Sequence, residues 1–291
     1  MIDAGHVPGI VKHTVHFGSR SYGRLTAGAR VLPSFLLCGG QRCGTTSLYR
    51  ALAAHPAALK AVLHKGVHYF DTGYHRGPRW YRAHFPLQRT ADRIADRLGV
   101  SPMAFESSPY YLYHPHAIAR IARDLPGVRL IVLVRDPVSR AHSQHAHELA
   151  RGFESEPSFG RALALEPARL RGQADRMVAD PRYRSFAHQH HAYRARGEYT
   201  RYLDAITDHL PPDHLLVLES HDLFTDPHPL YDRVLDFLGL PHLGYPTFDR
   251  LNARPRSPMQ DRVRRELTAH YAPFDAELSR WLGHPPSWRR P

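Results

Sequence analysis

The segment at residues 35–47, F-L-L-C-G-G-Q-R-C-G-T-T-S, joins an apolar run to a glycine-bracketed turn that carries one arginine and two threonines. An apolar strand, a tight turn and a helix start direct backbone N–H groups toward an anion. The loop of nucleotide triphosphatases ends in G-K-[ST], where the lysine reaches the β- and γ-phosphates. Here Thr45 follows Gly44, and the nearest cation is Arg42 inside the turn. The pattern predicts an anion-binding loop that differs from an ATP loop, and a plain strand–turn–helix connection is the alternative.

A second candidate anion site follows the most buried-looking strand of the sequence, V-R-L-I-V-L-V at residues 128–134. Arg135 stands where this strand should end, at the carboxyl edge where open α/β sheets bind ligands. Ser143 lies eight residues further, about two turns into a predicted helix, so it can face the same anion. An arginine fork and a hydroxyl together make a charge-assisted phosphate clamp. The alternative is that Arg135 and Asp136 only pair locally and cap the helix.

The elements that position these two segments alternate between strand and helix. Strands are expected at about 35–39, 103–106, 128–134 and 215–218. Helices are expected at about 45–54, 90–98, 115–124, 137–150, 158–170, 182–194, 199–209, 226–238 and 260–282. Strands that alternate with helices indicate an α/β fold with a central parallel sheet flanked by helices. We expect residues 1–33 to form an N-terminal extension and residues 34–291 a single domain.

Composition narrows the class of protein. No apolar run approaches the roughly 18 residues of a membrane span, and no signal peptide pattern begins the chain. The two cysteines, Cys38 and Cys43, are too few and too close for a disulfide framework, so a reducing cytoplasm is expected. The 23 histidines and the two cysteines show no H-E-x-x-H or C-x-x-C spacing, so no metal is expected. The net charge of +12 favours anionic ligands, but the arginines are scattered, which argues against nucleic acid as a partner.

Two anion motifs about 90 residues apart, each after a strand of one sheet, suit a nucleotide with phosphate on both its 5′ and 3′ sides. This arrangement resembles the sulfotransferase family that uses 3′-phosphoadenosine 5′-phosphosulfate (PAPS). The loop is similar to the family's 5′-phosphosulfate motif, commonly G-x-[KR]-x-G-T-[ST], and Arg135 and Ser143 match its 3′-phosphate motif. Weaker matches are F-E-S-S-P-Y at 105–110, K-G-V-H-Y-F at 65–70 and N-A-R-P-R-S-P-M at 252–259. The resemblance covers about 35–285 and is closer to the glycan-type branch, which includes heparan sulfate sulfotransferase domains and bacterial relatives.

The resemblance implies a P-loop-like sulfotransferase fold and a PAPS-dependent sulfotransferase. The enzyme would move a sulfuryl group to a hydroxyl or amine of a glycan, lipid or small natural product, release 3′-phosphoadenosine 5′-phosphate (PAP), and need no metal. Arg42 is expected to stabilise the leaving group. The expected donor-binding residues are Gly40, Gln41, Arg42, Cys43, Gly44, Thr45, Thr46, Arg135, Ser143, Arg254 and Arg256.

The catalytic base is less clearly marked, because relatives in the glycan-type branch often have Lys-Glu where this chain has Lys65-Gly66. A glycine cannot take a proton, and a histidine suits the task. We expect His68 first, because 65–70 resembles the family's acceptor-side strand and in a strand the His68 side chain faces with Gly66. His147 is second and His64 third. Lys65 is expected to bind the transferred sulfonate or the acceptor. Expected acceptor-side residues are Glu106, to orient Lys65 or Arg42, and Tyr110, with Tyr183, His188, Tyr193 and Tyr199 as possible wall residues.

Two other functions compete with this interpretation. A P-loop kinase or nucleotidase needs a loop lysine and a Mg²⁺-binding carboxylate on a neighbouring strand. The loop has no lysine, and the strand at 128–134 ends in Arg135. A non-catalytic polyanion-binding protein is the second alternative, suggested by the net charge alone.

Overall fold

The described part of the chain forms one five-stranded sheet. The structure is a computed structural model that describes residues 22–251 and 257–290. The strand order is β2-β3-β1-β4-β5, and each neighbouring pair runs parallel. The strands are β1 (Pro33–Leu37), β2 (Ala58–Lys60), β3 (Met103–Ser107), β4 (Arg129–Val134) and β5 (Leu215–Glu219). The predicted α/β fold with a central parallel sheet is confirmed.

The strand order places both candidate anion segments at one edge of the sheet. β1 lies in the middle, with β3 and β2 on one side and β4 and β5 on the other. A parallel sheet opens a crevice beyond the carboxyl ends of its strands at the point where the chain changes direction. That point lies between β1 and β4, and each of these strands is followed by one of the two segments.

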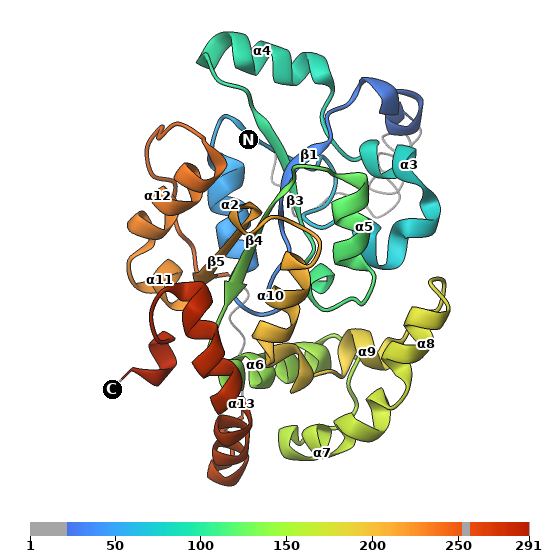
Figure 1. Cartoon of the computed structure of the whole chain (residues 1–291), viewed down its shortest axis with the longest axis vertical. Coiled ribbons are helices and arrows are strands. Elements are labelled where there is room, and N and C mark those ends of the chain that lie inside the picture. The colour runs from blue at the N-terminus through green and yellow to red at the C-terminus, as the bar shows by residue number, and fades with distance from the viewer. Residues whose placement is uncertain (1–21, 252–256, 291) are drawn as a thin grey trace, which may run out of the picture.

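Helices cover the sheet and extend it at the carboxyl edge. Figure 1 shows α2, α11 and α12 on one side of the sheet and α5 on the other, with α6 to α9 grouped beyond the end of β4. The α-helices are α2 (Thr45–Ala54), α3 (Pro78–Arg82), α4 (Gln88–Leu98), α5 (Ala117–Asp124), α6 (Pro137–Ala150), α7 (Phe159–Leu170), α8 (Gln173–Ala179), α9 (Phe186–His190), α10 (Tyr199–Thr207), α11 (Ser220–Thr225), α12 (Pro227–Leu238) and α13 (Asp261–Leu282). Short turns of other helix types are η1 (Ala27–Ala29), η2 (Tyr69–Gly73), η3 (Tyr74–Arg76), η4 (Pro109–Leu112), η5 (Ala195–Gly197), η6 (Pro212–His214) and η7 (Ser287–Arg289).

The burial of β4 explains why apolar and polar residues do not alternate along this strand. Leu130 to Val134 are fully buried, because helices cover both faces of a central parallel strand. Phe35 of β1 stacks on Phe105 of β3 with ring centroids 4.7 Å apart. At the end of β4, Asp136 caps α6, as predicted, by accepting from the backbone N–H groups of Val138 and Ser139 at 3.1 and 3.2 Å.

Two expectations for local structure were wrong. The segment 65–70 forms no strand: His68 adopts a left-handed backbone (φ 56°) and leads into η2, a π-helical turn. The helix expected at 182–194 forms only at Phe186–His190, because Ser185 caps its start and Glu166 accepts from the backbone N–H of Arg194 beyond its end. The short strand β2 and the helix α8 were not predicted.

Residues that precede β1 pack on the domain where they are described. Arg30 is buried, and its guanidinium donates to the carbonyl of Phe85 at 2.5 Å. The backbone N–H of Val31 donates to the carbonyl of Pro86. This part of the segment expected to be an extension therefore contributes to the packing of α3 and the chain that follows it.

Candidate active site

The loop between β1 and α2 is tightly folded, and glycine is required at two of its positions. A Cβ on Gly40 would lie 2.3 Å from both Cys43 Sγ and the Leu133 carbonyl oxygen, and Gly44 has φ +84°. Arg42 also adopts the left-handed region, with φ 71°, which is sterically costly for a residue with a Cβ. The loop ends at the start of α2, where the first backbone N–H groups have no partner within the helix. Residues 40–46 therefore form a tight turn that ends at the start of a helix.

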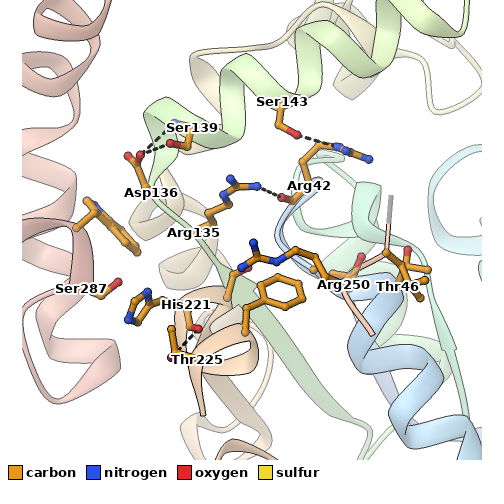
Figure 2. Close-up of a pocket in the computed structure, with 16 residues that line it drawn as sticks. Arg42, Thr46, Arg135, Asp136, Ser139, Ser143, His221, Thr225, Arg250 and Ser287 are labelled. Carbon is orange, nitrogen blue, oxygen red and sulfur yellow. Dashed lines mark hydrogen bonds between the residues drawn. The ribbon is translucent and has the colours of Figure 1, made fainter. Parts of the chain in front are cut away.

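A pocket of about 440 Å³ lies beside this loop. Its walls come from the segments that follow β1, β4 and β5 and from two segments nearer the C-terminus. Figure 2 shows Arg42, Arg135 and Arg250 converging on it from three parts of the chain. Its lining residues are Arg42, Gly44, Thr45, Thr46, Arg135, Asp136, Ser139, Ser143, Ser220, His221, Phe224, Thr225, Arg250, Leu251, Ser287 and Trp288. We call it the donor pocket.

The two predicted anion segments contact each other in the donor pocket. Arg42 Nε donates to Ser143 Oγ at 3.1 Å, and Arg135 Nη1 donates to the Arg42 carbonyl at 3.4 Å. Arg42 Nη1 lies 3.5 Å from Nδ1 of His147, and this nitrogen must accept because a guanidinium only donates. The Asp136 carboxylate is occupied by the cap of α6. The pocket is therefore dominated by cationic and hydroxyl groups.

Lys65 approaches the start of α2 from the segment after β2. Its Nζ donates to Thr45 Oγ1 and Thr46 Oγ1, each at 3.1 Å. Burial lowers the pKa of Lys65 to about 8, although the negative charge of Glu106 acts in the opposite direction. The ammonium group of Lys65 thus lies against the two threonines of the anion loop.

His68 forms a close pair with Asp71. Its Nδ1 lies 2.7 Å from Asp71 Oδ2, and 45% of the His68 side chain is exposed whereas Asp71 is fully covered. Burial disfavours the imidazolium, but the hydrogen bond and charge of Asp71, with the charge of Glu106, outweigh it and raise the pKa of His68. Burial would raise the pKa of Asp71, but its contacts with His68 lower it below the usual value. The geometry leaves Nε2 of His68 as the ring nitrogen not engaged by Asp71.

Gly66 makes room for the imidazole. A Cβ at this position would lie 2.7 Å from the Ser107 carbonyl oxygen, 2.9 Å from Ser108 Oγ and 3.3 Å from Nε2 of His68. A larger residue would therefore displace either the chain after β3 or the His68 ring. In this chain the imidazole occupies the space next to residue 66.

Glu106, expected on the acceptor side to orient Lys65 or Arg42, is completely buried. Its carboxylate accepts from the Val67 backbone N–H at 2.8 Å, from Ser108 Oγ at 2.6 Å and from the hydroxyl of Tyr111 at 2.6 Å. Burial raises the pKa of Glu106, against the effect of these donors. Its contacts fix the backbone that carries Lys65 and His68.

A second cavity, of about 570 Å³, lies between η2 and the segment from α8 to α9. Tyr110 and Tyr183 line it as expected of wall residues, and Asp71 borders it. Its lining residues are Asp71, Thr72, Tyr74, His75, Tyr110, His114, Met177, Pro181, Arg182, Tyr183, Arg184, Ser185 and Gln189.

Other expected wall residues are packed away. Tyr193 and Tyr199 are fully buried, and their hydroxyls donate to Glu154 Oε2 at 2.7 Å and the Arg135 carbonyl at 2.9 Å. His188 is also buried, 2.8 Å from the Tyr110 hydroxyl, and burial lowers its pKa to about 3. These three side chains are therefore part of the protein interior rather than of a cavity wall.

Several donor-pocket residues were not predicted, and Arg254 and Arg256 lie outside the described residues. Ser220 and His221 follow β5, so the rule applied to β1 and β4 would have found them. Arg250 and Trp288 reach the pocket by packing of distant segments, for which the sequence carries no local signal. Arg250 lies over the Phe224 ring at 4.7 Å, which adds a cation and an aromatic surface to the pocket.

The described residues lack both a metal-binding cluster and a membrane-spanning helix. They contain no cluster of three or more His, Cys, Asp or Glu side chains able to hold a metal ion. Within residues 22–251 and 257–290, no helix has both the length and the apolar character to cross a membrane.

Comparison with known proteins relates most of the chain to one family. The sulfotransferase domain family matches residues 32–258. The chain is 30% identical to human bifunctional heparan sulfate N-deacetylase/N-sulfotransferase 3, over 89% of this chain and 31% of that protein. It is 29% identical to mouse heparan sulfate glucosamine 3-O-sulfotransferase 6, over 90% of this chain and 75% of that protein.

A solved structure agrees with these matches. The crystal structure of a sulfotransferase from Alicyclobacillus acidocaldarius superposes with a TM-score of 0.66 at 26% identity, over 89% of this chain and all of that one. The chain thus spans about a third of the length of the human relative and the whole of the bacterial one. None of these matches supports the kinase or the polyanion-binding alternative. The chain belongs to the sulfotransferase domain family.

Proposed function

We propose that this protein transfers a sulfuryl group from PAPS to a hydroxyl or amine of a glycan. The observation that carries the proposal is the meeting of two arginine-bearing anion segments in one pocket, with Arg135 at 3.4 Å from the Arg42 carbonyl. The names of the relatives, which act on heparan sulfate, support a glycan acceptor. A lipid or small natural product would present the same hydroxyl chemistry.

The donor pocket fits PAPS as a substrate. The glycine-rich loop and the start of α2 supply backbone N–H groups for the 5′-phosphosulfate. Arg135 and Ser143 would bind the 3′-phosphate, since guanidinium and hydroxyl groups form charge-assisted bonds with phosphate oxygens. Phe224 and Trp288 offer aromatic surfaces on which an adenine base can stack. This set of cations and donors binds the substrate without a metal.

The residues around the loop can perform an in-line transfer. The acceptor atom attacks sulfur, the bond from sulfur to the bridging phosphate oxygen breaks, and its electron pair stays on the phosphate of PAP. Arg42, the loop N–H groups and Lys65 would stabilise the negative charge that develops on that oxygen. Nε2 of His68 would take the acceptor proton, while Asp71 holds Nδ1 and stabilises the imidazolium.

His147 is the second candidate base, but its contact suggests another role. Its Nδ1 accepts from Arg42, and Ser143 accepts from the same guanidinium. We propose that these two side chains of α6 hold Arg42 near the leaving group. His68 remains the first candidate because its partner Asp71 lines the second cavity.

We also propose a cytoplasmic location and a single catalytic domain over residues 34–291. Cys38 and Cys43 are both free and buried, which suits a reducing compartment. The last long helix, α13, packs on β5 and α6, so the C-terminal part joins the same core as the anion loop.

Calorimetry with PAP in the presence of EDTA tests the donor site directly. Transfer of radiolabelled sulfate from PAPS to N-desulfated heparan sulfate, with product analysis, then tests the reaction and separates amine from hydroxyl sulfation. A neutral glycan of similar length serves as the control acceptor. We expect metal-free binding and transfer; lack of affinity for both nucleotides, or Mg²⁺-dependent ATP turnover in their place, would refute the assignment.

A further inference from the structure

The residue next to Arg42 in the anion loop, Gln41, is held at both ends of its side-chain amide. Its Oε1 accepts from Nη1 of Arg196, and its Nε2 donates to Glu148 Oε1 at 3.1 Å. A guanidinium only donates and a carboxylate only accepts, so these two partners fix the orientation of the amide. We call Gln41, Glu148 and Arg196 the loop clamp.

The two charged members of the loop clamp are buried and anchored. Glu148, on α6, is 1% exposed, and its other oxygen lies 2.9 Å from Nδ1 of His190. Arg196, in η5, is 6% exposed, and its Nη2 donates to the carbonyls of His188 at 2.9 Å and Gln189 at 2.6 Å. A buried charge that loses its partner is strongly destabilising, and here the Gln41 amide connects the two opposite charges.

The clamp also ties the loop to one face of α6. Ser143 and His147 on this helix contact the Arg42 guanidinium, and Glu148, the next residue, contacts Gln41. Ser143 and His147 are four residues apart and so lie on the same side of the helix, and Glu148 follows one position further along it. Arg42 adopts a left-handed backbone, so neighbouring contacts must hold it there.

We propose that the side chains of the loop clamp position Arg42 for sulfuryl transfer and do not themselves bind the donor, which differs from the donor-binding role expected for Gln41 from the sequence. None of its three members is among the described residues that line the donor pocket. With residue 41 fixed from both sides, the backbone of Arg42 is held so that its guanidinium reaches the leaving group. This inference rests on the proposed function, and it assigns Gln41, Glu148 and Arg196 as positioning residues.

The test compares variants that break the clamp with one that preserves it. Gln41→Met keeps the length of the side chain and removes both hydrogen bonds, so we expect turnover to fall roughly 10–100-fold, as a small misplacement of a catalytic group does. The affinity for PAP should change less than about threefold, because the donor contacts are kept. Glu148→Ala should behave like Gln41→Met, whereas Glu148→Gln retains an acceptor for the Gln41 amide and should recover most of the turnover.

A matched control separates positioning from stability. Arg169→Met breaks another ion pair with a buried carboxylate, between Arg169 and Glu154 at 2.6 Å, away from the loop. It should lower the melting temperature but leave turnover of the folded protein unchanged. Equal losses of turnover and PAP affinity in Gln41→Met would make Gln41 a donor-binding residue and overturn the inference, as would normal turnover.

Hydrogen exchange distinguishes failure of the inference from failure of the proposed function. The amides of residues 40–46 should exchange faster in Gln41→Met and Glu148→Ala than in wild type or Arg169→Met, whatever reaction the protein performs. Unchanged exchange in both clamp variants overturns the loop clamp. Absence of nucleotide binding and transfer in the wild type would instead refute the proposed function.

Discussion

The proposed donor side and the proposed acceptor side of the site are built by different means. On the donor side, Arg135 directly follows β4 and Arg42 lies five residues after the adjacent parallel strand β1, and α2 and α6 begin within a few residues of them. On the acceptor side, Lys65 and His68 lie in an irregular segment that ends in a π-helical turn. Regular elements place the first set, whereas individual hydrogen bonds place the second.

The anion loop and the segment that carries His68 also differ in the contacts that hold their backbones. The anion loop is bounded by β1 and α2, so its ends are fixed by the sheet and the helix. The segment that carries His68 is held by the buried carboxylate of Glu106, which accepts from Val67, and by Ser108, which accepts from the His68 backbone N–H at 3.1 Å. We therefore expect the acceptor side to be more easily disturbed by substitution of a supporting residue.

The largest expected effect is on the acceptor side. His68→Ala should lower turnover at saturating donor by roughly 10²–10⁴, the usual contribution of a positioned general base. Affinity for PAP should stay near the wild-type value, because His68 is not among the residues of the donor pocket. His147→Ala is the comparison variant; near-normal turnover in both would mean that neither histidine is the base.

How far the site could be predicted from the sequence follows from the same contrast. Apolar runs, the glycines at 40 and 44 and the Asp136-Pro137 cap are local signals, so β1, α2, β4, α6 and both anion segments were predicted close to their observed bounds. The pair of His68 with Asp71 depends on the left-handed backbone of His68 and on the carboxylate of Glu106, which is distant in sequence. No hydrophobic periodicity predicts either feature. A strand over 65–70 was expected because the segment resembles a strand of the sulfotransferase family, but tertiary contacts decide the backbone there.

The next effect tests the donor side. Arg42→Ala should lower turnover by roughly 10²–10³, as removal of one preorganised donor to a developing charge does, and should weaken PAP binding much less. Arg42→Lys should retain part of the turnover, because it keeps the charge but not the fork that contacts Ser143. Initial rates and calorimetry measure the two quantities, and equal losses in both would make Arg42 a ground-state binding residue.

A smaller effect should separate the two phosphates. Arg135→Ala should weaken PAP binding by about 1.5–3 kcal/mol, the range for hydrogen bonds to charged groups. Adenosine 5′-phosphosulfate lacks the 3′-phosphate, so its affinity should hardly change in the same variant. Calorimetry with both ligands provides the measurement. A similar loss for both ligands would place Arg135 at the 5′ side and remove the proposed division between the two anion segments.

The smallest expected effect is a shift of the pH profile, and it tests whether Asp71 acts through His68. A base must be deprotonated to accept a proton, so turnover should rise with pH through the pKa of His68. The hydrogen bond and charge of Asp71, together with Glu106, overcome burial and raise this pKa above its ordinary 6.5, while the nearby Lys65 opposes them.

Asp71→Asn removes the negative charge and should therefore move the acid limb to lower pH. On the alkaline plateau of both profiles, any remaining loss of turnover measures the orienting and imidazolium-stabilising contribution of Asp71. A limb that stays in place in Asp71→Asn but disappears in His68→Ala would show that His68 titrates without its partner, and the acceptor side would then depend on one residue rather than on a pair.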